Sequence, residues 1–377
     1  MNLELTADQI ALREATRDFL TRQPDFDIRE STAKPQRRWR ISTWEALGDL
    51  GVQGLCMPTQ FGGSGLGPVE AVMIAEELGR ALAPEPVVEC AMVPAEALCR
   101  AAGEEQCERL LPSIASGDVL AVIARPDGPY SVPTINAWRE SDEFFVSGTA
   151  PLVRNAQSVN LLVVPAVLDD KVSFLLVDPI QPGVQRTAYL SHDQSQGATI
   201  CFDRAIAELM PAGSDEVLRT VVAFHQTALC SEAVGVMDTA LKTTVEYLQQ
   251  RRQFGSLLAD FQALSHRAAE MYVSVELARS ITRYASVVIG LDSIDADEHL
   301  ASRSAVQVCR AIRQIAETCI HMHGGIGVTE EHPIGRLAAR LIAIEQQLGG
   351  IDYHLDVLAD SVKPDRSPAI SDVELAL

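Results

Sequence analysis

The segment Arg-Arg-Gln-Phe-Gly at 251–255 holds the residues best suited to grip a phosphate. Its two arginines carry planar donor forks that match phosphate and pyrophosphate oxygens. Phe254 could pack against an aromatic ring, and Gln253 or Gln262 could read the edge of such a ring. The same segment also fits a solvated helix end capped by a glycine. Taken alone, it leaves a cofactor site and a plain helix end both open.

A second candidate is the run His-Met-His-Gly-Gly-Ile-Gly at 321–327. Backbone N–H groups of a glycine-rich turn can cradle phosphate. A helical pattern precedes the run, so it is not the strand–turn–helix fingerprint of a dinucleotide-binding fold. His321 and His323 could suggest a metal, but no neighbouring Cys or Asp completes a ligand set, and we predict no metal. A helix-stop turn explains Gly324 and Gly325 equally well when the run is taken alone.

The elements that must position these residues follow from hydrophobic periodicity. Helical spacing holds from about residue 6 to 116 and returns after 214, and short β-branched runs lie between. The predicted strands include 119–123, 160–164 and 172–177, and the predicted long helices are 216–250, 258–291, 296–321 and 336–347. We predict an α+β, mostly α fold with an N-terminal helical domain (1–118), a middle antiparallel β-domain (119–212), a C-terminal four-helix bundle (213–362) and a mobile tail (363–377).

Composition narrows the function classes. The 377 residues carry 31 basic and 51 acidic side chains, a net charge of −20. Such an acidic chain repels phosphate backbones, so nucleic acid is not an expected partner. No apolar run approaches the roughly 18 residues that span a bilayer, and the first residues lack the pattern of a secretory signal. Eight scattered cysteines indicate reduced thiols, and we expect a cytoplasmic location.

Together, the motifs resemble the acyl-CoA dehydrogenase family over about residues 6–360. The matching stretches keep the family's order: Phe61-Gly62-Gly63, Glu76 to Arg80, Tyr247 to Met271, and Gly324 to Thr329 with Pro333. The resemblance implies the same three-part fold. It also implies α,β-dehydrogenation of an acyl-CoA, in which a carboxylate takes the α-proton and the β-hydrogen leaves as hydride to the flavin.

The resemblance further implies an FAD shared across a subunit interface. The flavin ring would lie against the β-domain of one subunit, and the C-terminal domain of its neighbour would hold part of the pyrophosphate and adenine. Seven residues of this chain would then contact a partner's FAD: Arg251, Gln253, Phe254, Gln262, His321, Gly324 and Gly325. His321 stands where the family usually has glutamine. An electron-transfer flavoprotein is the implied electron acceptor.

The expected catalytic base is missing. The family's glutamate follows the glycine loop at a fixed distance, and that position here is Leu348, which cannot accept a proton. The nearest acid, Glu345, lies about one helical turn away. Some members carry the base on the first long helix of the C-terminal domain, where this chain has His225. Imidazole has a suitable pKa for a base, so His225 and Glu345 are the candidates for a displaced one.

The predicted flavin-ring contacts are also altered. The family's Thr-Glu-Pro segment corresponds to Ala124-Arg125-Pro126. Its strand with a Trp and a Thr that flank the ring corresponds to 148–154, which places Leu152 and Arg154 at those two positions. The hydroxyl donors and the tryptophan are therefore gone. In the last helix, the usual Arg-Asp pair becomes Ala339-Arg340.

These losses fall on the chain's own flavin-ring pocket and base, while the elements for the far end of a partner's FAD are retained. The pattern fits the non-catalytic subunit of a heteromeric α2β2 acyl-CoA dehydrogenase of the kind linked to steroid side-chain degradation. A homologous subunit would then carry the base. The alternatives are an active homomer with a displaced base, a flavin-dependent oxygenase, and a flavin-free scaffold.

Overall fold

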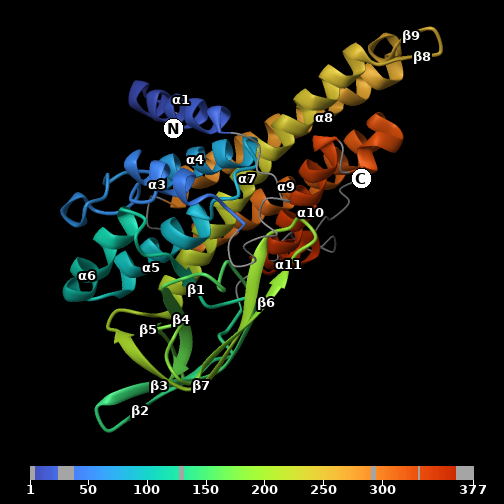
Figure 1. Cartoon of the computed structure of the whole chain (residues 1–377). Coiled ribbons are helices and arrows are strands. Elements are labelled where there is room, and N and C mark those ends of the chain that lie inside the picture. Colours follow the sequence, from blue (N-terminus) through green and yellow to red (C-terminus); the bar gives the residue numbers. More distant parts are fainter. Residues whose placement is uncertain (1–4, 24–37, 127–130, 290–293, 330–331, 362–377) are drawn as a thin grey trace, which may run out of the picture.

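The computed structural model describes residues 5–23, 38–126, 131–289, 294–329 and 332–361. It consists of N-terminal helices, a twisted β-sheet below them, and long C-terminal helices that extend away from both (Figure 1). This is the predicted fold class. The predicted tail at 363–377 lies outside the described residues.

The N-terminal helices pack around an apolar core that continues into the sheet. Thr6 caps the first of them. The Thr6 hydroxyl accepts from the Gln9 backbone N–H, and the Gln9 side-chain oxygen accepts from the Thr6 backbone N–H, so two N–H groups without a helical partner are satisfied. Pro68 occupies the first turn of another, where its missing N–H costs nothing. The helices are α1 (Ala7–Arg22), α3 (Ile41–Asp49), α4 (Pro68–Arg80), a π-turn (Val88–Met92), α5 (Val93–Ala101) and α6 (Glu104–Ala115).

The β-domain is a seven-stranded sheet in which β4, β2, β3, β7 and β5 are neighbours in that spatial order. β5 also pairs with β4, which closes the ring of strands. Its strands are β1 (Ala121–Ile123), β2 (Asn136–Glu140), β3 (Glu143–Arg154), β4 (Leu161–Leu168), β5 (Lys171–Val177), β6 (Val184–Leu190) and β7 (Gln196–Met210). Most pairs are antiparallel as predicted, but β1 and β2 each pair with β4 in parallel. The long connection from β1 to β4, which includes the β2–β3 hairpin, gives the chain the length that a parallel crossover needs.

The C-terminal part consists of α7 (Asp215–Gln250), α8 (Gln262–Ile289), α9 (Ile294–His323), α10 (Pro333–Leu348) and α11 (Gly350–Ser361). Ser214 caps α7, and Gly349 ends α10 in the left-handed conformation. The first four form the predicted bundle around a core of their own. Within the described ranges, no helix has both the length and the apolar character needed to cross a membrane.

Two glycines fix the position of α7 against the N-terminal helices. A side chain at Gly235 of α7 would collide with the backbone of α4 at Glu76, and one at Gly79 of α4 would collide with the backbone of Glu232. The two helices therefore approach each other more closely than side chains would permit. This contact fixes the position of α7 against α4.

Candidate functional site

The predicted cofactor segment at 251–255 forms a hairpin rather than a helix cap. α7 ends at Gln250, and the short strands β8 (Arg252–Gln253) and β9 (Ser256–Leu257) pair with each other. Phe254 and Gly255 form the two-residue turn with φ of 54° and 84°. Positive φ at both positions is typical of the tight turns that suit the twist of a hairpin. Gly255 tolerates this conformation, whereas a phenylalanine adopts it only at a cost.

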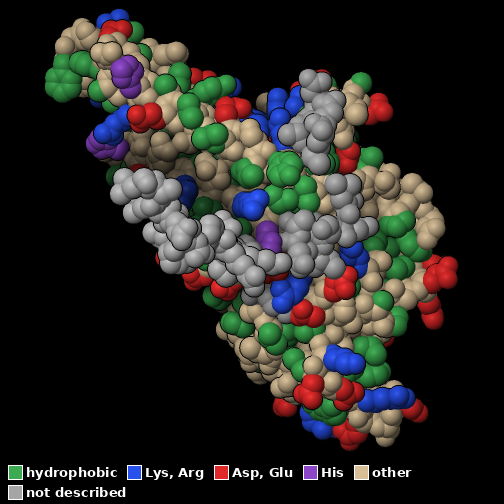
Figure 2. Space-filling model, turned by 180° about the vertical axis from the view of Figure 1, so that it is seen from behind, with side chains coloured by type: hydrophobic (Ala, Val, Ile, Leu, Met, Phe, Trp, Pro, Cys, Tyr) green, Lys and Arg blue, Asp and Glu red, His purple; other side chains and the backbone are tan. Residues whose placement is uncertain are grey.

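Phe254 is presented to solvent at the very end of the molecule. Phe254 is 91% exposed, and its ring meets the ring of Phe261 in an edge-to-face arrangement with the centroids 6.3 Å apart. Figure 1 shows the hairpin at the tip of the arm formed by α7 and α8, and the same arm projects to the upper left in Figure 2. A large apolar ring held outward on a strained turn is suited to contact another molecule.

The glycine run lies at the same end of the bundle. After α9, residues Gly324–Val328 form a 3₁₀ turn. The Tyr247 ring near the end of α7 stacks on His323 with a centroid distance of 4.4 Å, and its hydroxyl donates to the His323 carbonyl over 3.3 Å. His321 lies 2.9 Å from an Arg267 nitrogen of α8. The structure thus brings the ends of α7 and α9 and the start of α8 together.

We call this region, residues 251–262 and 321–328, the distal tip. It contains all seven residues predicted to contact a partner's FAD, and each of them is exposed. Gly324 and Gly325 have open space where a Cβ would be. Exposed guanidinium groups and an unobstructed glycine turn at the same end of the bundle can each receive phosphate oxygens, so the distal tip fits the pyrophosphate end of a dinucleotide.

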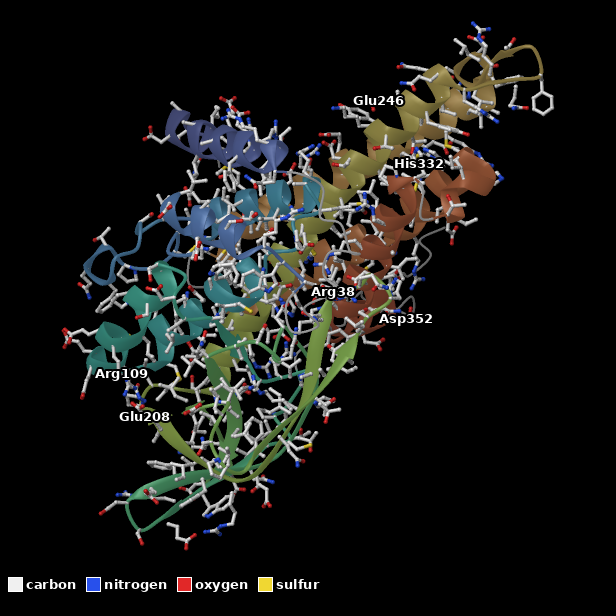
Figure 3. All side chains as sticks on the ribbon, in the orientation of Figure 1. Arg38, Arg109, Glu208, Glu246, His332 and Asp352 are labelled. Atoms are coloured by element: carbon white, nitrogen blue, oxygen red, sulfur yellow. The ribbon has the colours of Figure 1, made fainter. Side chains whose placement is uncertain are left out.

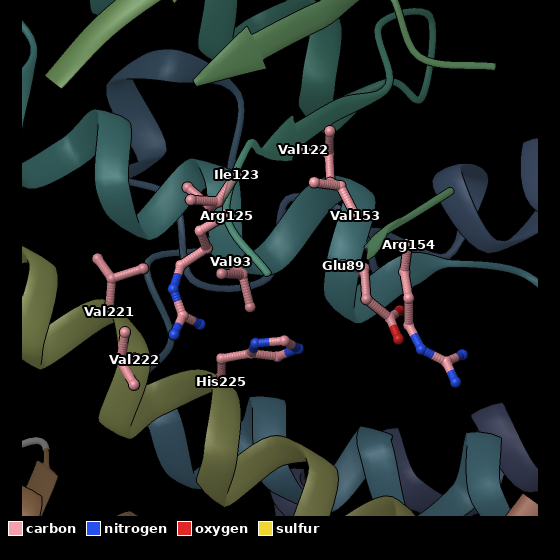
Figure 4. Close-up of a pocket in the computed structure, with 10 residues that line it drawn as sticks. All are labelled: Glu89, Val93, Val122, Ile123, Arg125, Val153, Arg154, Val221, Val222 and His225. Atoms are coloured by element: carbon pink, nitrogen blue, oxygen red, sulfur yellow. The ribbon is translucent and has the colours of Figure 1, made fainter. Parts of the chain in front are cut away.

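A second region lies where the β-domain meets α7. A pocket with about 420 Å³ of empty space, part of it open to solvent, is lined by six Val or Ile side chains and four polar ones (Figure 4). The polar residues are Glu89 on the π-turn, Arg125 after β1, Arg154 at the end of β3, and His225 on α7. His225 is therefore the predicted base candidate that does reach a pocket.

The environment of His225 keeps its imidazole neutral. Burial lowers the pKa of His225 to about 4, with further lowering by Arg125 and Arg154, while Glu89 acts in the opposite direction. Its Nε2 is buried without a hydrogen-bond partner among the described residues. A general base works best with a pKa near the operating pH, so this imidazole is a weak one.

The other two base positions point away from this pocket. The Leu348 side chain is fully buried in the core of the bundle. Its carbonyl accepts from His354 Nε2 over 2.7 Å, which fixes the end of α10. Glu345 forms an ion pair with Arg313 of α9. Neither residue lines the pocket beside the β-domain.

A partly buried cluster of charged and polar residues extends from Arg154 in the pocket lining, and we call it the joint cluster: Arg154, Asp193, Ser195, Glu232, Arg340 and Gln347. Asp193 and Ser195 lie in the turn before β7, Glu232 on α7, and Arg340 and Gln347 on α10. Asp193 lies 3.6 Å from Arg154 and 3.0 Å from Arg340. Arg340 also bonds Glu232 at 2.6 Å. The cluster therefore connects four separate parts of the fold: the end of β3, the turn before β7, α7 and α10.

The other bonds of the joint cluster provide hydrogen-bond acceptors for the Arg154 guanidinium. That guanidinium donates to Ser195 Oγ at 2.9 Å, and the Gln347 amide, oriented with its oxygen toward Arg154, accepts from it as well. Burial alone would raise the pKa of the Asp193 carboxyl, but Arg154 and Arg340 outweigh burial and hold this pKa well below its usual range. The cluster is a set of fixed ion pairs at neutral pH.

Sequence reasoning identified Arg154 and Arg340 only as departures from the family pattern, and it missed Asp193, Glu232, Gln347 and Glu89. A signal was available, because Glu89 and Glu232 are carboxylates within otherwise apolar helical stretches. Charged residues are rarely buried unless they are paired. Among the described residues, no group of three or more His, Cys, Asp or Glu side chains could hold a metal.

Comparison with known proteins defines the class. The family model "Acyl-CoA dehydrogenase, N-terminal domain" matches residues 6–118, and "Acyl-CoA dehydrogenase, C-terminal domain" matches 213–363. Together they span well over half of the chain. The chain belongs to the acyl-CoA dehydrogenase family, whose members are FAD-dependent oxidoreductases.

Individual relatives cover nearly the whole length. Acyl-CoA dehydrogenase FadE27 of Mycobacterium tuberculosis is 29% identical over 84% of this chain and 87% of its own. FadE28 of the same organism is 27% identical over 95% and 98%. Among solved structures, the ChsE4–ChsE5 complex of M. tuberculosis matches with a TM-score of 0.87 at 25% identity, over 96% of this chain and 98% of that one. The Tcur3481–Tcur3483 steroid acyl-CoA dehydrogenase matches with a TM-score of 0.84 at 26% identity, over 94% and 97%.

A glutaryl-CoA dehydrogenase of Mycobacterium smegmatis in complex with FADH2 shares the fold, with a TM-score of 0.83 at 20% identity over 94% of each chain. The two ends of an FAD meet different surroundings in the present chain. The distal tip fits a pyrophosphate, as described above. The joint cluster does not fit a flavin ring, because Arg154 and its partners stand where the resemblance places the ring's threonine contact.

Proposed function

We propose that this chain is the non-catalytic subunit of a heteromeric acyl-CoA dehydrogenase. A homologous partner subunit would carry the flavin ring and the catalytic base, and the distal tip of this chain would hold the ADP half of that FAD across the interface. One observation carries the proposal: the distal tip is open and exposed, whereas Leu348 stands at the usual base position and Arg154 of the joint cluster stands where the resemblance puts a flavin-ring contact. In this proposal the C-terminal domain (213–362) binds the ADP half of the partner's FAD, and the β-domain (119–212) binds no flavin ring.

The outer face of α8 supports a partner subunit beside the distal tip. Val273, Leu277 and Tyr284 follow the spacing of one helix face, with Tyr272 next to them, and all four are exposed. Hydrophobic side chains also appear on the back of this arm in Figure 2. An exposed apolar stripe that begins ten residues after Gln262 gives a second chain a surface to cover while it delivers a cofactor to the tip.

The substrate we propose is the CoA thioester of a steroid side chain. The proposed substrate is supported by the similarity to the Tcur3481–Tcur3483 steroid acyl-CoA dehydrogenase. The names of this protein and of the ChsE4–ChsE5 complex each join two different chains, which supports a heteromer. We propose an electron-transferring flavoprotein as the acceptor of the electrons.

The first experiment measures flavin content and native mass of the chain purified alone, after excess FAD has been added and removed. We expect little or no FAD and no dehydrogenation of any acyl-CoA. Co-expression with homologous acyl-CoA dehydrogenase subunits should yield a heteromer that retains FAD, and Arg251→Ala in this chain should weaken FAD retention in that heteromer. Stoichiometric FAD in a homomer that dehydrogenates an acyl-CoA would contradict the proposal.

The second candidate is an active homomer with a displaced base, and one observation favours it. His225 lines the pocket beside the β-domain, and its Nε2 has no hydrogen-bond partner among the described residues. A true base at this position should cost orders of magnitude in kcat when it is replaced by alanine. Parallel His225→Ala and Glu345→Ala variants of the purified chain, assayed with acyl-CoA thioesters, decide between the two candidates.

A further inference from the structure

The joint cluster occupies the place of a specific cofactor contact. By resemblance, the strand at 148–154 places a Trp and a Thr against the flavin ring, and here those positions are Leu152 and Arg154. Leu152 has φ of 53° and is 56% exposed, so its side chain lies outside the protein core. Arg154 instead extends from the end of β3 to Gln347 on α10.

The same bonds connect the β-domain to the helical bundle. Asp193 lies in the turn before β7. Its Oδ2 forms ion pairs with Arg154 of the β-domain and with Arg340 of α10. Arg340 continues to Glu232 on α7. Only 2% of the Asp193 side chain is exposed, so these ion pairs lie in a low-dielectric environment where they are screened little.

Burial of this kind requires complete pairing. An unpaired charge in such a position is strongly destabilising, whereas a fully bonded cluster can hold separate elements in one arrangement. Asp193 also accepts from the Ser195 backbone N–H at 3.1 Å and from its hydroxyl at 2.6 Å. The Asp193 carboxylate therefore has partners on both oxygens.

We propose that the joint cluster is a built-in substitute for a flavin ring: Arg154 fills this chain's own ring site, and the cluster joins the β-domain to the bundle without a cofactor. The inference rests on the proposed function and adds the physical reason why this chain does not accept a ring. It assigns a positioning role to Arg154, Asp193 and Arg340.

The test uses lumiflavin, which is the flavin ring without its ADP half. We expect no saturable binding of lumiflavin to the native chain, measured by fluorescence quenching and by a shift in the thermal midpoint. Arg154→Thr should open a saturable site and make the thermal midpoint rise by several degrees on addition of lumiflavin. This variant leaves Asp193 paired with Arg340 and bonded to Ser195, so it creates no unpaired buried carboxylate.

Arg109→Thr is the matched control, because Arg109 pairs with Glu208 at the surface, 2.6 Å away, between α6 and the β-domain (Figure 3). It should stay unresponsive to lumiflavin. Saturable binding by the native chain would overturn the inference, and so would a folded Arg154→Thr chain that does not respond. Should Arg154→Thr not fold, Arg154→Gln shortens the same side chain while it keeps a donor for Ser195 Oγ, and the same gain or its absence decides.

The two proposals fail separately. Lumiflavin binding by the native chain would remove the inference but leave the distal tip free to serve a partner's FAD. A heteromer whose FAD retention is indifferent to Arg251→Ala would remove the role of the distal tip in the proposed function, but a native chain closed to lumiflavin would still support the inference.

Discussion

The distal tip and the joint cluster differ in almost every physical respect. At the tip, arginines and a phenylalanine are exposed on a strained hairpin turn next to open glycines. At the joint, one arginine is buried, the other is largely buried, and both are bonded to carboxylates, a hydroxyl or an amide. Arginine side chains are therefore available to a ligand at the distal tip, whereas at the joint cluster they are bonded to other residues of the chain.

The difference shows that the role of an arginine depends on the residues around it in the folded chain. An arginine fork recognises phosphate when nothing in its own chain satisfies it, and it becomes a structural element when buried acids do. In this chain the first condition holds at the tip and the second at the joint. Four variants follow in order of expected effect: Arg340→Ala and Phe254→Gly test the two regions themselves, and Leu348→Glu and His225→Leu test the interior next to the joint cluster.

Leu348→Glu should destabilise the chain by more than about 4 kcal/mol and should not create dehydrogenase activity. The leucine side chain is fully buried in the bundle core, where an ionised carboxylate has no partner. Urea unfolding measures the loss, and Leu348→Met, which conserves volume, should stay within about 1.5 kcal/mol of the native chain. A stable and active Leu348→Glu enzyme would mean that this position faces a working site.

Arg340→Ala should cost about 3–5 kcal/mol, because it leaves Glu232 without its cationic partner and leaves Asp193 with Arg154 as its remaining cation. The exposed pair of Arg109 and Glu208 provides the comparison, since Arg109→Ala should cost no more than about 1 kcal/mol. Equilibrium unfolding of both variants at the same pH and salt concentration checks the contrast. Equal costs would show that the joint cluster is no more important than a surface ion pair.

His225 should make stability depend on pH. Its pKa is about 4 in the folded chain, so the unfolded chain binds its proton first as the pH falls. The stabilisation is complete above about pH 6.5, is lost between about pH 6.5 and 4, and amounts to roughly 3 kcal/mol in total. Urea midpoints across this range should fall more steeply for the native chain than for His225→Leu. Identical slopes would contradict the buried, neutral imidazole.

Phe254→Gly should raise the stability of the isolated chain by roughly 0.5–1 kcal/mol, because glycine adopts the φ of 54° without the cost borne by phenylalanine. The same change should weaken FAD retention in the heteromer. Phe254→Ala is the control, because it removes the ring but keeps a Cβ at positive φ, so it should weaken FAD retention without the gain in stability. Full FAD retention by both variants would exclude a cofactor contact for this ring.

Much of the fold follows from the sequence. Apolar spacing and the absence of breakers predicted a helix at 216–250, and the structure has α7 at Asp215–Gln250. The helix predicted from 258 begins only at Gln262, because Leu258–Asp260 form a 3₁₀ turn after the hairpin. Local patterning determines such elements because neighbouring residues decide which face can be buried.

The sequence alone also determined what this protein lacks at the usual base position, since leucine accepts no proton in any fold. What it did not determine was which charged residues meet. Arg154, Asp193, Glu232 and Arg340 are separated by tens of residues and come together only because β3, the turn before β7, α7 and α10 converge. Ion pairing depends on distance in space and on burial, and both are decided by tertiary packing. The sequence therefore specified the residues available, and the tertiary structure decided which of them remain free to bind.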